Sequence, residues 1–187
     1  MEEVQLVKRM KAGDRSAFDS IYEQYHIPIF RAAYLLCGNR QDAEDVLQET
    51  FLLCWLHSRE LRKEESFRYW LFRIMTKEAA RAAKKRSMLY PDENIQETVD
   101  RKRSSEDAGG PDEYEKLLER NIVEAAMEKL PAQQREVVVL YYYSSMSVKE
   151  IAATLQVFEG TVKSRLFMAR NNLRSAMEQH EKESRNG

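Results

Sequence analysis

Glycine and proline are scarce in this sequence, at six and four residues in a chain of 187. Alternation of apolar and polar residues with a period of two, the pattern of a half-buried β-strand, is almost absent. Apolar residues recur instead at the spacings of three and four that are typical of amphipathic helices. The sequence therefore predicts an all-α fold from near the N-terminus to Met177.

Long apolar runs are also missing, and no stretch approaches the about 20 residues that a membrane-spanning helix needs. Residues 1–11 mix acids and bases and lack the apolar core of a secretory signal, so we expect a cytoplasmic protein. Cys37 and Cys54 lie far apart without the paired spacing of a metal site, which favours buried free thiols. The three histidines are scattered, and neither a nucleophile motif nor a glycine-rich phosphate loop is present. We expect no enzymatic activity, metal, cofactor or small-molecule substrate.

The net charge of −1 conceals segments of opposite sign. Residues 62–86 contain nine bases and three acids, whereas residues 92–119 contain ten acids and four bases. Residues 161–174 contain four bases and no acid. Basic surfaces attract the phosphate backbone of nucleic acids, although most charged runs only solvate a surface.

The segment from residue 91 to 111 consists mainly of Asp, Glu, Ser, Arg and Gly, with very few apolar side chains. Such a composition cannot bury enough apolar surface to fold by itself. We therefore expect a flexible acidic linker over residues 89–113. It joins two small helical domains, over residues 1–88 and 114–187, each near the lower size limit for a single core.

Helical spacing predicts three helices in the N-terminal domain, over residues 16–36, 40–57 and 67–86. Asn39 is placed to cap the second of these helices, and negative charge in its first turn suits the helix dipole. One side of this helix is apolar and is expected to pack. The opposite side is acidic and available, and it consists of Asp42, Asp45, Gln48 and Glu49.

The third helix has an apolar side and an unusually basic C-terminal half. The apolar side consists of Trp70, Leu71, Ile74 and Met75. The basic residues are Arg73, Lys77, Arg81, Lys84 and Lys85. On charge alone, a solvated face with positive charge near a helix C-terminus is the simpler interpretation.

The C-terminal domain opens with helical spacing over residues 117–130, followed by Pro131 at a helix start. Residues 137–143 are seven consecutive apolar or aromatic residues, a pattern compatible with a buried strand or a buried helix. A single strand would have no partner here, so we expect a helix buried on most sides. Its three adjacent tyrosines cannot all face inward.

Residues 147–174 have the features of a helix-turn-helix. Ser147 and Glu150 have the spacing of a capping box, which marks a helix start. Residues 156–160 are long enough only for a turn, and helical spacing resumes from Thr161 to Met177 with an apolar side that packs.

The opposite side of this last helix combines short hydroxyls, long cations and an apolar ring, the mixture that major-groove reading requires. A helical hairpin with a solvated basic face has a similar pattern. The capping box, the tight turn and the absence of acids together favour DNA binding. The candidate contact residues are Thr161, Lys163, Ser164, Arg165, Phe167 and Arg170, with Met168, Asn171 and Arg174 on the same side.

The same residues resemble the helix-turn-helix with which extracytoplasmic-function sigma factors, of the sigma-70 superfamily, read the promoter minus-thirty-five element. The segment Glu159-Gly-Thr-Val-Lys-Ser-Arg-Leu166 matches the hallmark of that family. Asp42-Ala-Glu-Asp-Val-Leu-Gln-Glu-Thr-Phe51 is similar to the family's polymerase-binding helix, and Trp70-Leu-Phe-Arg-Ile74 to its promoter-melting segment. These matches occur in the family's order and spacing, so the resemblance covers nearly all of the chain except the linker.

This resemblance implies an alternative sigma factor that carries core RNA polymerase to selected promoters. It implies that Asp45, Gln48 and Glu49 contact the coiled-coil helices of the largest polymerase subunit. It further implies that residues 1–88 recognise and melt the minus-ten element and that residues 114–187 read the minus-thirty-five element. The family also suggests a membrane-anchored or soluble anti-sigma partner, released by a stress signal, and nucleoid association in the holoenzyme.

The chain departs from the family pattern at four positions. Lys77 stands where the family commonly has Asn in the minus-ten pocket. Arg81 replaces a frequent Asp or Asn. Phe158 replaces the usual Ser or Pro before the recognition helix, and Phe167 replaces a common His or Arg. The alternative function from another class is a stand-alone helix-turn-helix regulator, but the acidic helix over residues 42–49 favours the polymerase subunit.

Overall fold

The computed structural model describes residues 3–89 and 126–185, and all regular elements in these ranges are helical. This confirms the predicted all-α class. The predicted linker, apart from its first residue, lies outside the described residues, as does most of the helix expected over residues 117–130.

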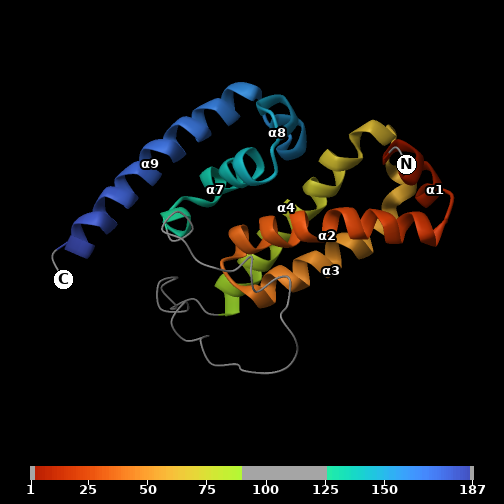
Figure 1. Ribbon diagram of the computed structural model, residues 1–187, viewed down its shortest axis with the longest axis horizontal. Coiled ribbons are helices and arrows are strands. Elements are labelled where there is room, and N and C mark those ends of the chain that lie inside the picture. The colour runs from red at the N-terminus through yellow and green to blue at the C-terminus, as the bar shows by residue number, and fades with distance from the viewer. Residues whose placement is uncertain (1–2, 90–125, 186–187) are drawn as a thin grey trace.

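The N-terminal half is a bundle of four helices with two short 3-10 turns before the last helix (Figure 1). The elements are α1 (Glu3–Lys11), α2 (Arg15–Cys37), α3 (Arg40–His57), η1 (Ser58–Glu60), η2 (Glu64–Ser66) and α4 (Phe67–Leu89). The three expected helices correspond to α2, α3 and α4, with α4 three residues longer than predicted. The short helix α1 packs on α2 and buries Leu6, Val7 and Met10.

Local capping explains where these helices begin and end. The side chain of Asp14 accepts hydrogen bonds from the backbone N–H groups of Ser16 (2.9 Å) and Ala17 (3.3 Å) and starts α2. The hydrogen bonds that Asp14 accepts from the Ser16 hydroxyl (2.7 Å) and from Arg9 (2.8 Å) lower the pKa of Asp14 to about 2. Gly38 ends α2 in the left-handed region at φ 74°, which favours glycine. As predicted, Asn39 then caps α3 by accepting from the N–H of residue 42 at 2.9 Å.

The C-terminal half consists of α7 (Ala132–Val138), the π-helical segment η4 (Val139–Tyr143), α8 (Val148–Leu155) and α9 (Glu159–Arg185). The segment over residues 137–143 is thus helical, as expected, but its second part widens into a π-helix. Val137, Val139 and Leu140 are fully buried, whereas Tyr142 is 52% exposed. The π-turn lets the apolar residues face the core while one tyrosine faces solvent.

The helix-turn-helix is confirmed. The Ser147 hydroxyl accepts from the N–H of Glu150 (3.3 Å), and the Glu150 carboxylate accepts from the N–H of Ser147 (2.6 Å). Gln156 ends α8 in the left-handed region at φ 57°. The second helix of the motif, α9, starts at Glu159, two residues earlier than predicted, and continues to Arg185.

The two halves pack against each other, and their buried residues form one contiguous apolar cluster. Helix α4 contacts α8, and α2 contacts η4 and α7, so that α7, α8 and α9 lie on one side of the N-terminal bundle (Figure 1). Cys37 and Cys54 are buried and unpaired, as expected, and burial raises the pKa of each thiol to about 12. Within the described ranges, no helix is long and apolar enough to cross a membrane.

Candidate functional site

The polar side of α3 presents the residues expected to contact polymerase. Asp45 and Gln48 are exposed and Glu49 is partly exposed. Asp42, expected on the same available side, instead forms an ion pair with Arg86 of α4 at 2.9 Å. The accessible acidic surface of α3 therefore begins at Asp45.

Two exposed leucines that the sequence-based prediction omits continue this surface. Leu52 is 51% exposed and Leu56 is 61% exposed. They follow Asp45 by 7 and 11 residues, and at about 100° per residue these spacings return to the same side of a helix. The spacing that groups Asp45 with Glu49 would have identified them. We call the exposed side formed by Asp45, Gln48, Glu49, Leu52 and Leu56 the α3 stripe.

The cations expected to follow minus-ten DNA lie along one side of α4. Their spacings place Arg73, Lys77, Arg81 and Lys84 within about 80° of each other around the helix, with Lys85 about 40° further. Lys77, Arg81, Lys84 and Lys85 are exposed. Arg81 forms an ion pair with Glu78 at 2.8 Å, and Glu78 is only 7% exposed.

Arg73, at the N-terminal end of this basic side, contacts the C-terminal half. Its Nη2 donates to the carbonyl of Ala153 at 2.6 Å and its Nε to the carbonyl of Thr154 at 3.2 Å. The structure therefore separates Arg73 from the other four cations, because it lies against α8 and they face solvent.

The outward side of α9 contains most of the residues expected to read minus-thirty-five DNA. Lys163, Ser164, Phe167 and Arg170 are exposed, while Thr161 is partly buried at the start of the helix. Phe167 is 66% exposed. Val162, Leu166 and Ala169 face the core from the opposite side. The helix thus keeps a mixed polar, basic and aromatic surface open to a partner.

Two arginines of this set are held by neighbours on α7 and η4. Arg165 is partly buried and donates to Oε1 of Gln133 at 3.0 Å. Arg170 donates from Nε to the hydroxyl of Tyr142 at 2.9 Å, and its guanidinium lies 5.9 Å from the ring centres of both Tyr141 and Tyr142. These contacts fix the direction of both side chains at the edges of the α9 surface.

The start of α9 exposes a second phenylalanine. Phe158 is 86% exposed, and its carbonyl accepts the N–H groups of Thr161 (2.9 Å) and Val162 (3.2 Å). Its side chain has no hydrogen-bonding group that could cap the helix. The departure from the family pattern at this position therefore places an apolar ring where a capping side chain is usual.

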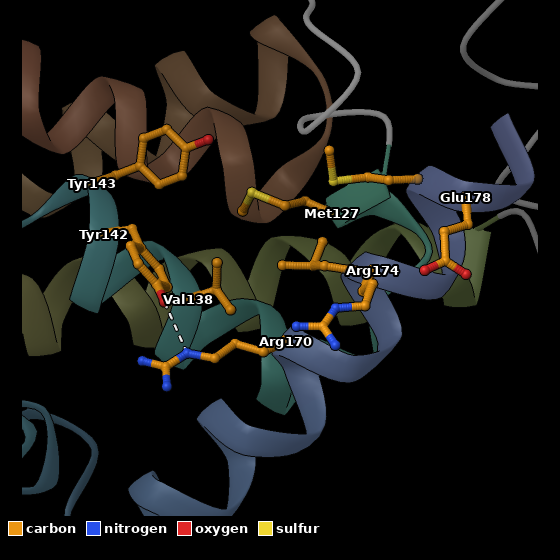
Figure 2. Close-up of a pocket in the computed structure, with 9 residues that line it drawn as sticks. Met127, Val138, Tyr142, Tyr143, Arg170, Arg174 and Glu178 are labelled. Atoms are coloured by element: carbon orange, nitrogen blue, oxygen red, sulfur yellow. Dashed lines mark hydrogen bonds between the residues drawn. The ribbon is translucent and has the colours of Figure 1, made fainter. Parts of the chain in front are cut away.

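A pocket of about 500 Å³ lies beside this surface, between α9 and the α7–η4 segment (Figure 2). Its walls are mainly apolar, with two arginines and a glutamate. Figure 2 shows Tyr142 and Arg170 joined by their hydrogen bond at one end and Arg174 and Glu178 toward the other. The lining residues are Met127, Val138, Tyr142, Tyr143, Arg170, Leu173, Arg174, Met177 and Glu178.

In the part of the chain that the structure describes, no group of three or more His, Cys, Asp or Glu side chains could hold a metal ion. The three candidate surfaces lie on different helices. None of them combines a nucleophile with an adjacent base. What they offer instead is charge, exposed apolar area and hydrogen-bonding groups for contacts with macromolecules.

Comparison with known proteins gives two family matches in chain order. Residues 21–88 match the model of Sigma-70 region 2, and residues 120–173 match the model of Sigma-70 region 4. The ECF RNA polymerase sigma factor SigW of Bacillus subtilis is 32% identical over 176 residues, which cover 91% of this chain and 94% of SigW. SigE of Mycolicibacterium smegmatis is 34% identical over 92% of this chain and 67% of its own.

Solved structures show the same fold. CnrH, in complex with the cytosolic domain of CnrY, has a TM-score of 0.69 at 23% identity and covers 95% of this chain and 97% of its own. The sigma factor RpoE of Bartonella quintana, in complex with the anti-sigma factor NepR, has a TM-score of 0.67 at 26% identity. This likeness covers 86% of the present chain and 96% of RpoE.

These relatives favour the polymerase subunit over the stand-alone regulator, because they match both halves of the chain rather than its helix-turn-helix alone. The chain belongs to the extracytoplasmic-function sigma factors of the sigma-70 family.

Proposed function

We propose that this sigma factor binds core RNA polymerase through the α3 stripe, follows the minus-ten element with α4 and reads the minus-thirty-five element with α9. In this proposal residues 1–88 form the polymerase-binding and promoter-melting domain, and residues 114–187 form the upstream-reading domain. One observation supports it above the others: an acidic and apolar stripe on α3 and an acid-free reading surface on α9 are both exposed in one chain.

The α3 stripe has the composition of a protein-binding surface rather than a nucleic-acid-binding one. Asp45 and Glu49 would repel phosphates, whereas they complement a basic helical partner. Leu52 and Leu56 add exposed apolar area one and two turns further along. A partner helix that presents cations near Asp45 and apolar side chains near Leu56 would match both ends.

The α4 and α9 surfaces have the opposite character. Lys77, Arg81, Lys84 and Lys85 supply phosphate contacts along α4, which position a protein on DNA without reading its sequence. On α9, Lys163, Ser164 and Phe167 offer a cation, a hydroxyl and an apolar ring for base edges in the major groove. Thr161, Arg165 and Arg170 lie around these three residues and would contact flanking phosphates.

An anti-sigma factor, soluble or anchored in the membrane, is the proposed inhibitor, since RpoE of Bartonella quintana was solved with such a partner. We place the protein in the cytoplasm, on the nucleoid when it is part of the holoenzyme. Its relatives are transcription initiation factors, and we propose that it has no catalytic activity of its own.

The decisive experiment is retention of core polymerase by the full-length chain, followed by run-off transcription from genomic fragments. We expect transcripts that core polymerase alone does not make. Glu49→Lys should abolish core retention because it reverses the charge within the stripe, whereas Glu23→Lys, an exposed charge reversal on α2, should retain core. Failure of the wild-type chain to retain core would refute the proposal and favour a stand-alone regulator.

A further inference from the structure

The pocket between α9 and the α7–η4 segment has the size of a small-molecule site. Its volume is about 500 Å³, and pockets that bind small molecules have volumes of about 300–1,000 Å³. The apolar part of its wall consists of Met127, Val138, Tyr143, Leu173 and Met177. Such a wall favours an apolar ligand group, because burial of that group removes apolar surface from water.

The π-helical segment η4 supplies one side of this pocket. The N–H of Ser144 donates to the carbonyl of Val139, five residues earlier, at 3.1 Å and closes the wide turn. Val139 is fully buried, whereas Tyr142 is 52% exposed and lines the pocket. Single π-turns are rare and occur frequently at functional sites. The irregular turn here places a phenol hydroxyl at one end of an apolar recess.

Tyrosines hold Arg170 at that end of the pocket (Figure 2). Its Nε donates to the hydroxyl of Tyr142 at 2.9 Å, and its guanidinium lies 5.9 Å from the ring centres of Tyr141 and Tyr142. Nη1 and Nη2 of Arg170 have no partner among the residues that the structure describes. Neutral groups therefore fix the direction of this guanidinium, and both outer nitrogens can donate to an anion.

The pocket has an excess of positive charge at the Arg170 end. Arg174 and Glu178 follow Arg170 at intervals of four residues, which places all three on one side of α9. Figure 2 shows Arg174 and Glu178 toward the other end of the pocket. Glu178 is the one carboxylate among the lining residues, and it lies one turn from Arg174 and two turns from Arg170. The charge of Arg170 is therefore the uncompensated one.

We propose that this pocket binds a free single-chain amphiphile with a carboxylate head, of the class of medium-chain fatty acids. The two carboxylate oxygens accept from Nη1 and Nη2 of Arg170, a pairing that the planar guanidinium fork favours. The apolar chain packs against Leu173 and Met177. One fixed cation at the end of an apolar recess matches a ligand with one charged end.

Ligand binding occupies a residue that the reading surface of α9 also uses. Arg170 is assigned above to a flanking phosphate, so this consequence rests on the proposed function, whereas binding of the amphiphile does not. A carboxylate and a DNA phosphate compete for the same N–H groups. Because the loss of one charge-assisted hydrogen bond changes an affinity by about tenfold, the bound amphiphile weakens minus-thirty-five binding by up to about that factor.

Calorimetric titration of the full-length chain, without polymerase or DNA, tests the binding. The probes are octanoate, decanoate and dodecanoate, each below its critical micelle concentration. Affinity should rise up to about fourfold per added methylene and level off once the pocket is full. Dodecyltrimethylammonium, with the same chain and the opposite charge, should bind at least about tenfold more weakly than dodecanoate. Equal binding of these two probes would overturn the proposal.

Two variants separate the role of the head from that of the chain. Arg170→Gln should weaken decanoate at least about tenfold and leave the neutral probe decanol unaffected. Met177→Trp should weaken both probes, because the indole ring takes up part of the pocket. The matched control is Lys163→Gln, which removes an exposed cation of α9 that does not line the pocket. This control should bind both probes as wild type does, and a loss equal to that of Arg170→Gln would refute the assigned head site.

Two other occupants of the pocket give different results. If vesicles of anionic phospholipid retain the chain while free dodecanoate does not bind, the pocket contacts a membrane and the free-ligand proposal is wrong. If the chain forms dimers that dodecanoate does not dissociate and that Met177→Trp abolishes, the pocket binds a second copy and the proposal is equally wrong.

Promoter binding by the holoenzyme then tests the competition at Arg170. Dodecanoate should weaken wild-type binding to a duplex with the minus-thirty-five element and should not affect Met177→Trp. An unchanged affinity of the wild-type holoenzyme would refute the competition. Failure of the chain to retain core polymerase would refute the sigma-factor roles instead, and it would not alter the titration of the free chain.

Discussion

Phe167 offers the sharpest test of how this factor selects its promoters. Its side chain is 66% exposed on the outward side of α9. Lys163 lies one turn before it and Asn171 one turn after, and both are exposed. An apolar ring among polar readers in a major groove meets the C5-methyl group of thymine. We therefore predict that Phe167→Ala selectively lowers affinity for promoters with thymine at one minus-thirty-five position.

The expected size follows from the contact that is lost. Removing one methyl group from water contributes about 0.8 kcal/mol, which corresponds to about fourfold in affinity. The cations of α9 remain in the variant, so the dependence of binding on salt should not change. A loss of about fourfold with an unchanged salt slope distinguishes apolar base reading from a general weakening of DNA binding.

The assay is equilibrium binding of holoenzyme to duplexes in which each minus-thirty-five thymine is replaced in turn by uracil, which lacks the methyl group. At one position, uracil should weaken wild-type binding about fourfold and leave Phe167→Ala unaffected, so that the two changes are coupled in a double-mutant cycle. Phe158→Ala is the matched control, since it removes the other exposed phenylalanine of the motif. If Phe167→Ala stays as sensitive as wild type at every thymine, the ring does not read a methyl group.

Three further outcomes can be measured. Arg135→Met removes the guanidinium that donates to the carbonyls of residues 127, 128, 130 and 36. This loss should cost about 2–3 kcal/mol and lower the urea midpoint by about 1 M, and an unchanged midpoint contradicts the role of Arg135. Leu52→Glu should reduce core retention at least tenfold, because Leu52 belongs to the α3 stripe. Thermal stability should be kept, because the Leu52 side chain is 51% exposed. Normal retention would exclude Leu52 from the interface. The pKa of Asp14 is lowered to about 2 from 3.8, so its contribution to stability is present above pH 3.8 and is lost as the pH falls toward 2. Asp14→Ala should therefore show a smaller loss of stability over that pH interval, and an unaltered acid transition in chemical denaturation would argue against the cap.

The features that could be predicted from the sequence are those that depend on residues close together in the chain. Asn39 caps α3 through the N–H three residues later, and Ser147 with Glu150 forms the capping box across the same spacing. The apolar positions of α9, such as Val162 and Leu166, face the core because helical geometry alone places them on one side. Local rules sufficed because the interacting groups are at most one helical turn apart.

The π-helical segment shows where such rules stop. The run Val137–Tyr143 was compatible with a helix or a strand, since β-branched and aromatic residues pack well in both. Its conformation is decided by tertiary contacts: Val139 and Leu140 are fully buried while Tyr143 lies against Arg31 of α2. A partner more than a hundred residues away is not encoded in the local pattern.

Arg73 illustrates the deeper reason why the packing between the halves could not be predicted. Sequence spacing places it with Lys77 on the basic side of α4, and that placement is correct for the backbone. Spacing does not determine whether a guanidinium binds the carbonyls at a helix C-terminus or the oxygens of a phosphate, because both partners are negatively polarised acceptors of similar geometry. In the free chain Arg73 binds the carbonyls of Ala153 and Thr154. A phosphate can occupy the same donors only after those two hydrogen bonds break, so the two kinds of partner compete for this guanidinium.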